Sequence, residues 1–438
     1  MPREIKESNT EWIGAIPSGW NTSILKNCLT EINDANNPIK TKNVLSLTNK
    51  LGVVPYEDKG NQGNKAKEDY SGYKLAYENT IVANSMNVLI GSVGISNYYG
   101  CVSPVYYVFK AKPNSDLRYI NYIFQNTGFQ KELRKYAKGI MEIRLRISSH
   151  DILRRTVPFP DKQTQTRIAD YLDNICHSID RTIADTEKSI EEYKKLRQSI
   201  ITEAVTKGVR GKCEMVETEV EWIGTIPKTW NMTRMKNCVK ARVSGAWGDD
   251  SKKDDGDIVC MRIADFDYDR LTFNNSGKYT IRNYDSKTIE RLKLSDGDIL
   301  IEKSGGGEKT PVGRAVVFNL GIDALYANFM DKIICKPEYN SRWLAYVFAA
   351  FYQNGFINNY IKQTTGIQNL DLTAMLSSEK IPVPTKDEQN EIVSMLDIKC
   401  KKINDLIDKK RKFIEELTHY RQSIIYEYVT GKKEVPEL

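Results

Sequence analysis

The chain has 438 residues, of which 40% are hydrophobic and 28% are charged. This composition is typical of soluble globular proteins, and the length suffices for two or three domains. No stretch approaches the roughly 18 consecutive apolar residues that a membrane-spanning helix needs, which excludes that class of protein. The charged, polar N-terminus has no apolar signal sequence, so we expect a cytoplasmic protein without a membrane partner.

A net charge of +7 permits a polyanionic partner, because attraction to phosphates depends on clustered lysine and arginine. The eight cysteines are scattered without a CxxC pair, and the three histidines lie far apart in the chain. A structural zinc site needs clustered thiolates and imidazoles. We therefore expect buried, reduced cysteines and no metal site.

Two copies of one apolar signature indicate that the chain is duplicated. "EWIGAIPSGWN" starts at Glu11 and "EWIGTIPKTWN" starts at Glu221, 210 positions later, with eight of eleven residues identical. Farther along, "VPFPDKQTQTRIADYLD" from Val157 resembles "IPVPTKDEQNEIVSMLD" from Ile381, and there the offset is 224. The halves match at both ends, and the middle of the second half is longer by about 14 residues, the difference between the offsets. So long a period indicates two homologous domains rather than short repeats.

The middle of each half predicts strands followed by a helix. In the first half, short β-like runs lie between Gly, Asn and Pro turns over residues 40–112, and "DLRYINYIFQNTGFQKELRKYA" has a helical pattern. In the second half, "DIVCMRIADF", "GDILIEKSGGG", "GRAVVFN" and "DKIICK" precede the helical pattern "SRWLAYVFAAFYQNGFINNYIK". This order favours an α+β domain of about 150 residues in each half.

Each half ends in a long amphipathic helical pattern. Apolar residues recur in steps of three and four after the paired prolines, and "RQSII" occurs in both patterns, at Arg197 and at Arg421. A helix of about 40 residues is about 60 Å long, more than a compact domain needs, so we expect the two helices to pack on each other. The alternative is that each helix covers its own domain. The expected interface residues are Leu172, Ile179, Ile190, Ile200, Leu396, Ile403, Ile414 and Ile424.

The predicted fold is α+β. Two homologous α/β domains, related by pseudo-twofold symmetry, are separated by a pair of long antiparallel helices that resemble a coiled coil. We place the first domain at residues 1–157, the first long helix at 158–210, the second domain at 211–381 and the second long helix at 382–438. We interpret the repeated Trp–Ile–Gly signature as an apolar contact that fastens each domain to the long helices or to a partner.

Motifs of catalysis are missing from the sequence. "SGGGEKT" at residues 304–310 has Glu308 where a phosphate loop requires its second glycine. No G-x-S-x-G elbow, H-E-x-x-H zinc helix or N/D-P-P-aromatic tetrapeptide of an amino-methyltransferase occurs. "DDSKKDDGD" at residues 249–257 is more typical of a solvated turn than of a metal loop. We therefore expect a protein that binds rather than catalyses, with no catalytic residues.

Basic residues cluster in "KGIMEIRLRISSHDILRRT", where Lys138 precedes Arg144 and Arg146. The two arginines alternate with apolar residues, so one face of an extended segment would be basic and the other buried. Arginine suits bidentate contact with guanine edges or phosphates. The corresponding segment of the second half, "KQTTGIQNLDL", includes Thr365 and the amide of Gln368, and amides can read adenine. An ordinary surface turn is the alternative for both segments.

The glycine-rich stretch "EKSGGGEKTPVGR" is a second candidate for anion binding. Its three glycines allow backbone amides to approach a phosphate closely, and basic side chains surround them. The alternative is a flexible hairpin tip. The candidate residues are Lys303, Ser304, Gly306, Lys309 and Arg314.

The whole arrangement resembles the specificity (S) subunit of bacterial type I restriction–modification enzymes. The resemblance rests on the two W-I-G-x-I-P-x-x-W signatures, the two P-x-P helix starts and the endings "LRQSIITEAVTKG" and "HYRQSIIYEYVTG". Within the middles, "NSMNVLIGSVGISNYYGCVSPVYYV" and "GDILIEKSGGGEKTPVGRAVV" also resemble target-recognition segments of that family, which adds Asn87 to the expected DNA contacts.

The resemblance implies a subunit whose two domains each read one half of a split, asymmetric site on double-stranded DNA. It further implies that the long helices set the spacing and that two methyltransferase (M) subunits and restriction (R) subunits are partners. S-adenosylmethionine, ATP and Mg would then be bound by the partners, and this chain would hold no cofactor.

Two other functions remain open on the sequence. A stand-alone DNA-modifying enzyme with an unrecognised site would methylate DNA without a partner. A coiled-coil scaffold with no nucleic-acid role would show no salt-dependent DNA binding.

Overall fold

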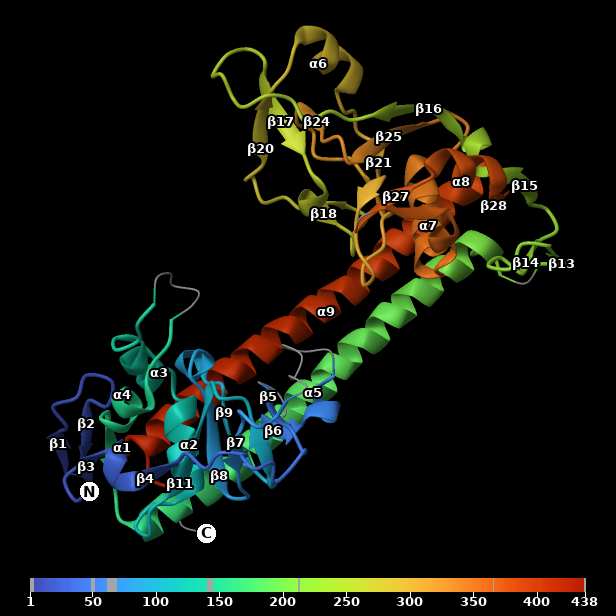
Figure 1. Ribbon diagram of the computed structural model, residues 1–438. Coiled ribbons are helices and arrows are strands. Elements are labelled where there is room, and N and C mark those ends of the chain that lie inside the picture. Colours follow the sequence, from blue (N-terminus) through green and yellow to red (C-terminus); the bar gives the residue numbers. More distant parts are fainter. Residues whose placement is uncertain are drawn as a thin grey trace. The chain divides into compact units, whose positions relative to one another are not determined.

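A computed structural model of the chain describes residues 4–48, 52–60, 69–139, 145–211, 213–364 and 366–436 (Figure 1). The contacts between residues divide the chain into two compact units. Unit 1 comprises Met1–Thr186 and Lys412–Leu438, and unit 2 comprises Glu187–Arg411. Each unit therefore contains one α/β domain together with a segment of each long helix. None of the helices in the described ranges is both long and apolar enough to cross a membrane.

The two long helices are the longest elements of the fold. Helix α5 spans Lys162–Lys207 and helix α9 spans Lys386–Val429, shown in green and red in Figure 1. The Asp161 carboxylate accepts a hydrogen bond from the Thr164 amide at 3.0 Å, which caps the start of α5. Both helices end before a glycine with a left-handed backbone, Gly208 at φ +76° and Gly431 at φ +70°, as is common at helix C-termini.

Helices α5 and α9 pack on each other in antiparallel orientation within each unit. In unit 1 the ring centroids of Tyr171 and Tyr428 are 4.6 Å apart, and Asp180 forms an ion pair with Arg421 at 2.9 Å. In unit 2 Arg197 hydrogen-bonds Asn404. As the residue numbers rise along α5, the numbers of the contacting residues in α9 fall. This order confirms the predicted antiparallel pairing.

The interface residues predicted from the sequence occupy the inner faces of these helices. Six are buried, namely Leu172, Ile179, Ile190, Leu396, Ile403 and Ile424. Ile200 and Ile414 are partly buried. The apolar stripe recognised in the sequence is therefore the packed face of each helix.

The two α/β domains share one sheet topology, which confirms the duplication. The central sheet of unit 1 has the order β4-β11-β8-β9, and that of unit 2 has the order β16-β25-β21-β23, with every pair antiparallel. The strands of unit 1 are β4 (Leu29–Ile32), β11 (Tyr106–Ala111), β8 (Thr80–Asn84) and β9 (Val93–Ser96). Those of unit 2 are β16 (Val239–Ser244), β25 (Met330–Cys335), β21 (Ile299–Glu302) and β23 (Ala315–Val317).

Two smaller antiparallel pairs are also repeated in the two units. One pair joins the strand at the end of the signature to the strand before the long helix. The other pair joins a strand before the signature to a strand within it. In unit 1 they are β3 (Asn21–Ile24) with β12 (Thr156–Phe159), and β1 (Ile5–Glu7) with β2 (Ala15–Pro17). In unit 2 they are β15 (Asn231–Arg234) with β28 (Lys380–Val383), and β13 (Met215–Glu217) with β14 (Thr225–Pro227).

Most of the remaining strands differ between the units, whereas the short helices at residues 25–28 and 149–153 of unit 1 correspond in position to those at residues 235–238 and 372–378 of unit 2. Unit 1 adds β5 (Leu45–Thr48) with β6 (Gly52–Pro55), β7 (Lys74–Ala76) with β10 (Gly100–Val102), α1 (Leu25–Cys28), α4 (Ser149–Leu153) and the 3-10 helices η1 (Tyr56–Lys59) and η2 (Asn87–Ile90). Unit 2 adds a pair and two three-stranded sheets. The pair is β18 (Phe266–Asp267) with β19 (Thr272–Phe273). One sheet has the order β20 (Thr280–Asn283), β17 (Asp257–Met261) and β24 (Ala324–Tyr326), and the other has the order β22 (Ser304–Gly305), β27 (Ile367–Leu370) and β26 (Ile361–Thr364). Its short helices are α6 (Ser286–Leu292), α8 (Leu372–Ser378), η4 (Met235–Cys238) and η5 (Ile263–Asp265).

The helical stretch after each central sheet is shorter than its sequence pattern suggests. In unit 1 it is two helices, α2 (Leu117–Gln125) and α3 (Thr127–Arg134), because the side chain of Asn126 caps the second helix through the Phe129 amide at 3.1 Å. In unit 2, α7 (Ser341–Gln353) ends before Gly355, and the chain continues as η6 (Phe356–Tyr360) and then as strand β26.

The repeated signature packs on the ends of the long helices. In unit 1 the Ile13 carbonyl accepts from the Tyr426 hydroxyl at 3.5 Å and from Lys432 at 3.0 Å. A Cβ added to Gly431 would lie 2.6 Å from the Pro17 ring. In unit 2 the exit of α5 packs similarly, because a Cβ on Gly208 would lie 3.0 Å from the Trp230 ring. The signature of each half thus contacts the exit of the helix that belongs to the other half.

We predict that Gly431→Ala lowers the melting temperature more than Gly211→Ala. Both glycines have left-handed backbones, at φ +70° and +68°, so each alanine costs roughly 1–2 kcal/mol in conformation. Only the Gly431 site is crowded, whereas the Cβ at Gly211 meets no atom within 4 Å. Overpacking therefore adds about 1–3 kcal/mol at Gly431 alone. Equal shifts in thermal unfolding of the two variants would contradict this packing of the signature on α9.

Candidate nucleic-acid interface

The glycine-rich stretch of unit 2 lies between the central strands β21 and β23. Its first residues form β22, in which Ser304 and Gly305 pair with Asn369 and Gln368 of β27. The Ser304 hydroxyl also hydrogen-bonds the Asn369 side chain at 2.7 Å. Gly305 and Gly306 have positive φ, at +117° and +67°, which only glycine adopts readily. The two candidate segments of this half are thus neighbouring strands of one small sheet.

Lys303 contributes its charge to a buried cluster around Asp331. Its ammonium group lies 2.9 Å from the Asp331 carboxylate, which also accepts from Ser244 at 2.8 Å and from Arg242. Burial alone would raise the pKa of Asp331, but the hydrogen bonds from Lys303, Ser244 and Arg242 outweigh it and lower the pKa. This cluster anchors the start of the glycine-rich stretch to β25.

Arg314 is bound at the other end of the same stretch. Its guanidinium group lies 2.9 Å from the Glu302 carboxylate, which is only 2% exposed, and 3.6 Å from the centroid of the Tyr268 ring. Glu302 also accepts a hydrogen bond from the Tyr268 hydroxyl. Burial opposes the charge of Arg314, yet the contacts with Glu302 raise its pKa. The carboxylate and the ring fix the guanidinium at the base of the hairpin.

Gln368 is also engaged inside the domain, because it is buried and its side-chain oxygen accepts from the Val312 amide at 3.3 Å. The exposed members of the predicted set in this unit are Gly306 and Lys309. Thr365 lies outside the described residues. The predicted set of unit 2 therefore divides into a buried base and an exposed tip.

The structure adds exposed residues that the sequence analysis missed. Phe329 is 48% exposed, and its carbonyl accepts from the Lys303 amide at 2.9 Å, so it lies beside the glycine-rich stretch. Ile367 on β27 is 52% exposed, and the side chain of Lys362 on the paired strand β26 is exposed as well. Single apolar residues between polar neighbours give no sequence signal, because exposure depends on tertiary contacts.

In unit 1 the basic segment is closed by a short bridge between Lys138 and Arg146. The two backbones exchange hydrogen bonds of 2.7 and 2.9 Å, and both side chains are exposed. Ile147 is 1% exposed, and its amide donates to the Ser85 carbonyl at 3.1 Å. That bond brings the basic segment next to the loop that leads to Asn87, which is exposed at the start of η2. Arg144 lies outside the described residues.

An exposed arginine–tyrosine stack adjoins the basic segment of unit 1, where the guanidinium of Arg155 lies 3.4 Å from the centroid of the Tyr136 ring. Tyr136 is 40% exposed. The sequence analysis placed Arg155 in the basic cluster but did not select Tyr136. A flat arginine on an aromatic ring is held in an orientation suited to contact with a phosphate or a base.

The acidic stretch at residues 249–257 forms a turn held by its own hydrogen bonds. Ser251 and Asn283 donate to the Asp257 carboxylate, and these bonds lower its pKa to about 2. Among the residues that the structure describes, no three Asp, Glu, His or Cys side chains are grouped as metal ligands.

A family model for the type I restriction modification DNA specificity domain matches residues 17–192 and 227–418. The chain therefore belongs to the family of type I restriction–modification DNA specificity proteins and carries the family's domain twice.

Two curated relatives are specificity subunits. The MjaVIII specificity subunit of Methanocaldococcus jannaschii is 25% identical over 285 residues, which is 64% of this chain and 63% of that protein. The EcoBI specificity subunit of Escherichia coli is 23% identical over 306 residues, 65% of this chain and 60% of that protein. The chain thus matches less than two thirds of the length of these relatives.

The fold is similar to that of a solved protein chain. The similar chain comes from work on the complex assembly and conformational transition of the type I R-M system. The TM-score is 0.69 at 13% sequence identity, and the match covers 95% of this chain and 99% of that chain.

We predict effects of very different size on stability for two basic residues of the glycine-rich stretch. Arg314→Ala leaves the buried Glu302 without its counter-charge and should lower the free energy of unfolding by about 3 kcal/mol. Lys309→Ala removes an exposed side chain and should change that free energy by less than about 0.5 kcal/mol. Denaturant unfolding measures both. Equal effects would show that the division into a buried base and an exposed tip is wrong.

Proposed function

We propose that this chain is the subunit that selects the DNA sequence in a type I restriction–modification complex, and that each α/β domain reads one half of a bipartite, asymmetric site. The observation that carries the proposal is the contrast between the repeated and the divergent parts of the fold. The central sheets and the pairs β1–β2 and β3–β12 recur in the second unit, whereas the other described sheets differ in strand number and order. The two domains share one frame but project different hairpins, so each domain could read a different half-site.

The exposed residues supply both kinds of contact that such a reader needs. Lys309, Lys138 and Arg146 can approach phosphates, which position the protein but carry little sequence information. Base discrimination requires groups that reach the groove edges, and the turn at Gly306 and the amide of Asn87 are exposed for that role. Under this proposal Lys303, Arg314 and Gln368 act through the shape of the hairpin rather than by direct contact.

The proposal assigns the chemistry to partners. Two methyltransferase subunits would supply S-adenosylmethionine and the methylating site, and restriction subunits would supply ATP- and Mg-dependent cleavage. This chain would be non-catalytic, as the designation of its relatives as specificity subunits suggests.

Helix α9 offers a surface on which such partners could assemble. In unit 1, Phe413 and Tyr420 lie seven residues apart on this helix, and their side chains are 44% and 55% exposed. A heptad of apolar residues on the outer face of a helix is typical of a surface that another helix covers.

We predict that replacing residues 238–380 with those of a homologue changes only one half-site. This segment contains the strands and hairpins of the second domain, whereas both signatures and both long helices stay unchanged. Sequencing of the methylated adenines made by the reconstituted complex measures both half-sites. A change in both would show that the domains do not read independently.

We also predict that shortening both long helices by one turn changes the spacer between the half-sites. One turn is about 5.4 Å, and DNA rises 3.4 Å per base pair, so the preferred spacer should shorten by about one or two base pairs. The half-site sequences should remain, because the domains are untouched. Restoring the deleted turn in both helices is the matched control, and an unchanged spacer in the shortened variant would refute the role of the helices in spacing.

A further inference from the structure

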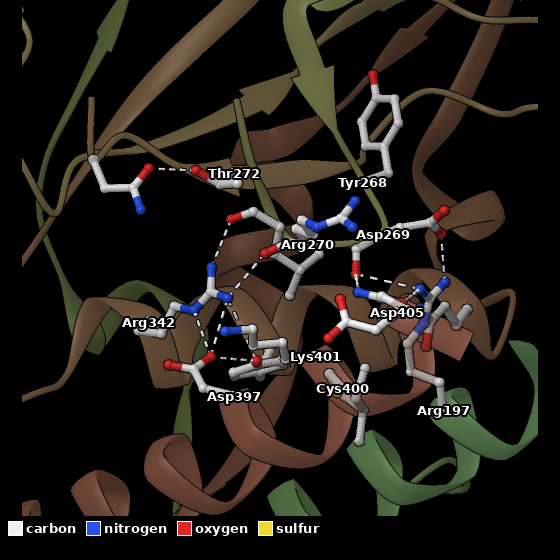
Figure 2. A pocket seen from close by; sticks show the side chains of 16 residues that line it. Arg197, Tyr268, Asp269, Arg270, Thr272, Arg342, Asp397, Cys400, Lys401 and Asp405 are labelled. Atoms are coloured by element: carbon white, nitrogen blue, oxygen red, sulfur yellow. Dashed lines mark hydrogen bonds and ion pairs between the residues drawn. The ribbon is translucent and has the colours of Figure 1, made fainter. Parts of the chain in front are cut away.

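A turn of the second domain makes ionic contacts with both long helices. The turn connects β18 to β19, and its residues 268–271 line a cavity of 280 Å³ together with parts of α5, α7 and α9 (Figure 2). All of these residues belong to unit 2. We refer to residues 267–271 as the helix-contacting turn.

Asp269 is the centre of the helix-contacting turn. Its carboxylate lies 2.6 Å from the guanidinium of Arg197 on α5 and 3.4 Å from that of Arg411 on α9. Its carbonyl accepts from the Asn404 side chain at 2.8 Å. Arg197 is only 7% exposed, so its charge needs this partner. The contacts with Arg197 and Arg411 lower the pKa of Asp269 although its burial opposes this.

The backbone of the same turn is fixed from a third helix. Arg342 of α7 donates to the Leu271 carbonyl at 2.7 Å and to the Arg270 carbonyl at 2.9 Å. Leu271 is buried with a left-handed φ of +51°, a conformation that a leucine keeps only where its surroundings impose it. The turn is therefore held in one conformation.

The residue before Asp269 connects the turn to the candidate interface. Tyr268 hydrogen-bonds Glu302, and its ring lies 3.6 Å from the guanidinium of Arg314. In Figure 2 the Tyr268 side chain points away from the helices, while Asp269 lies against Arg197. Two adjacent residues thus contact the helix pair on one side and the base of the glycine-rich hairpin on the other.

In the first half, the corresponding arginine is paired with a carboxylate that does not come from a turn of the recognition domain. At the repeat offset of 224, Arg421 corresponds to Arg197, and Asp180 corresponds to Asn404. Arg421 pairs with Asp180 at 2.9 Å, so there the carboxylate comes from the long helix itself. In the second half the helix supplies an amide, and the carboxylate comes from Asp269. If Arg197 needed only a counter-charge, a carboxylate on the long helix would neutralise it as well as Asp269 does.

We propose that Asp269 is a positioning residue that fixes the glycine-rich hairpin of the second domain relative to the long helices, and thereby sets the spacing tolerance of DNA recognition. The inference rests on the proposed function for its DNA consequence only. The mechanical link from Asp269 through Tyr268 to Glu302 and Arg314 exists whether or not the chain reads DNA.

The test separates positioning from charge neutralisation by transferring the carboxylate to the helix. Asp269→Asn alone leaves Arg197 unpaired and should lower the melting temperature. Asp269→Asn combined with Asn404→Asp gives Arg197 a carboxylate on α9, as Asp180 does for Arg421, and should reverse part of that decrease, because an aspartate at position 404 no longer donates to the carbonyl of residue 269. Asp323→Asn removes an exposed ion pair with Lys293 in the same domain and is the matched control.

Hydrogen–deuterium exchange of the purified full-length chain gives the first readout. In the double variant we expect amides of residues 303–314 to exchange about tenfold faster than in the wild type, because the coupling is lost although the fold is restored. Asp323→Asn should leave these amides unchanged. Wild-type exchange in the double variant would overturn the proposal, and so would a rise of equal size in the control.

Adenine-methylation sequencing of the reconstituted complex gives the second readout. The double variant should methylate sites whose spacer differs by one base pair, which the wild type rejects, with both half-site sequences unchanged. An unchanged spacer would overturn the DNA consequence of the proposal. If the wild-type complex selects no bipartite site while the exchange result holds, the proposed function fails and the mechanical link stands.

Discussion

The burial of one apolar stripe on each long helix is the constraint on which the rest of the structure depends. A helix as long as α5 or α9 with charged residues on most of its surface gains little stability from its own hydrogen bonds, so tertiary packing must supply it. Each helix meets that need by packing on the other within each unit, with Leu172 and Ile424 buried in unit 1 and Leu396 and Ile403 in unit 2. The Trp–Ile–Gly signatures complete the arrangement, because each packs on the exit of one long helix. A signature that is repeated in sequence is thereby explained by a contact that is repeated in structure.

The repeated frame leaves the remaining segments free to diverge. Both central sheets keep one strand order, while, within the described residues, the added sheets are two-stranded in unit 1 and include two three-stranded sheets in unit 2. The extra length of the second half includes strands that carry the helix-contacting turn. The second domain therefore differs from the first in its added sheets and also in the way in which it is attached to the long helices. Asp269 is linked to both differences. It contacts Arg197 of α5, and its neighbour Tyr268 contacts Glu302 and Arg314 at the base of the hairpin.

Much of this fold could be predicted from the sequence, because its strongest signals are periodic. The long helices follow from apolar residues in steps of three and four, and the duplication follows from two constant offsets. The break at Asn126 was missed because a capping side chain competes with an otherwise helical pattern. The candidate site was less predictable. Lys303 and Arg314 are basic residues in a glycine-rich stretch, yet Lys303 is bound by Asp331 of a later strand, and Arg314 is bound by Glu302 at the start of the same stretch. Sequence alone cannot distinguish a charge that faces DNA from one that faces a buried carboxylate.

Under the proposed function, one chain holds two different readers on one frame. The most direct measurement is a map of the adenines methylated by the wild-type chain with its methyltransferase subunits on DNA of random sequence. The account predicts two short half-sites of different sequence, separated by one fixed length of unread base pairs. A single continuous motif, or two half-sites at freely varying separation, would contradict it.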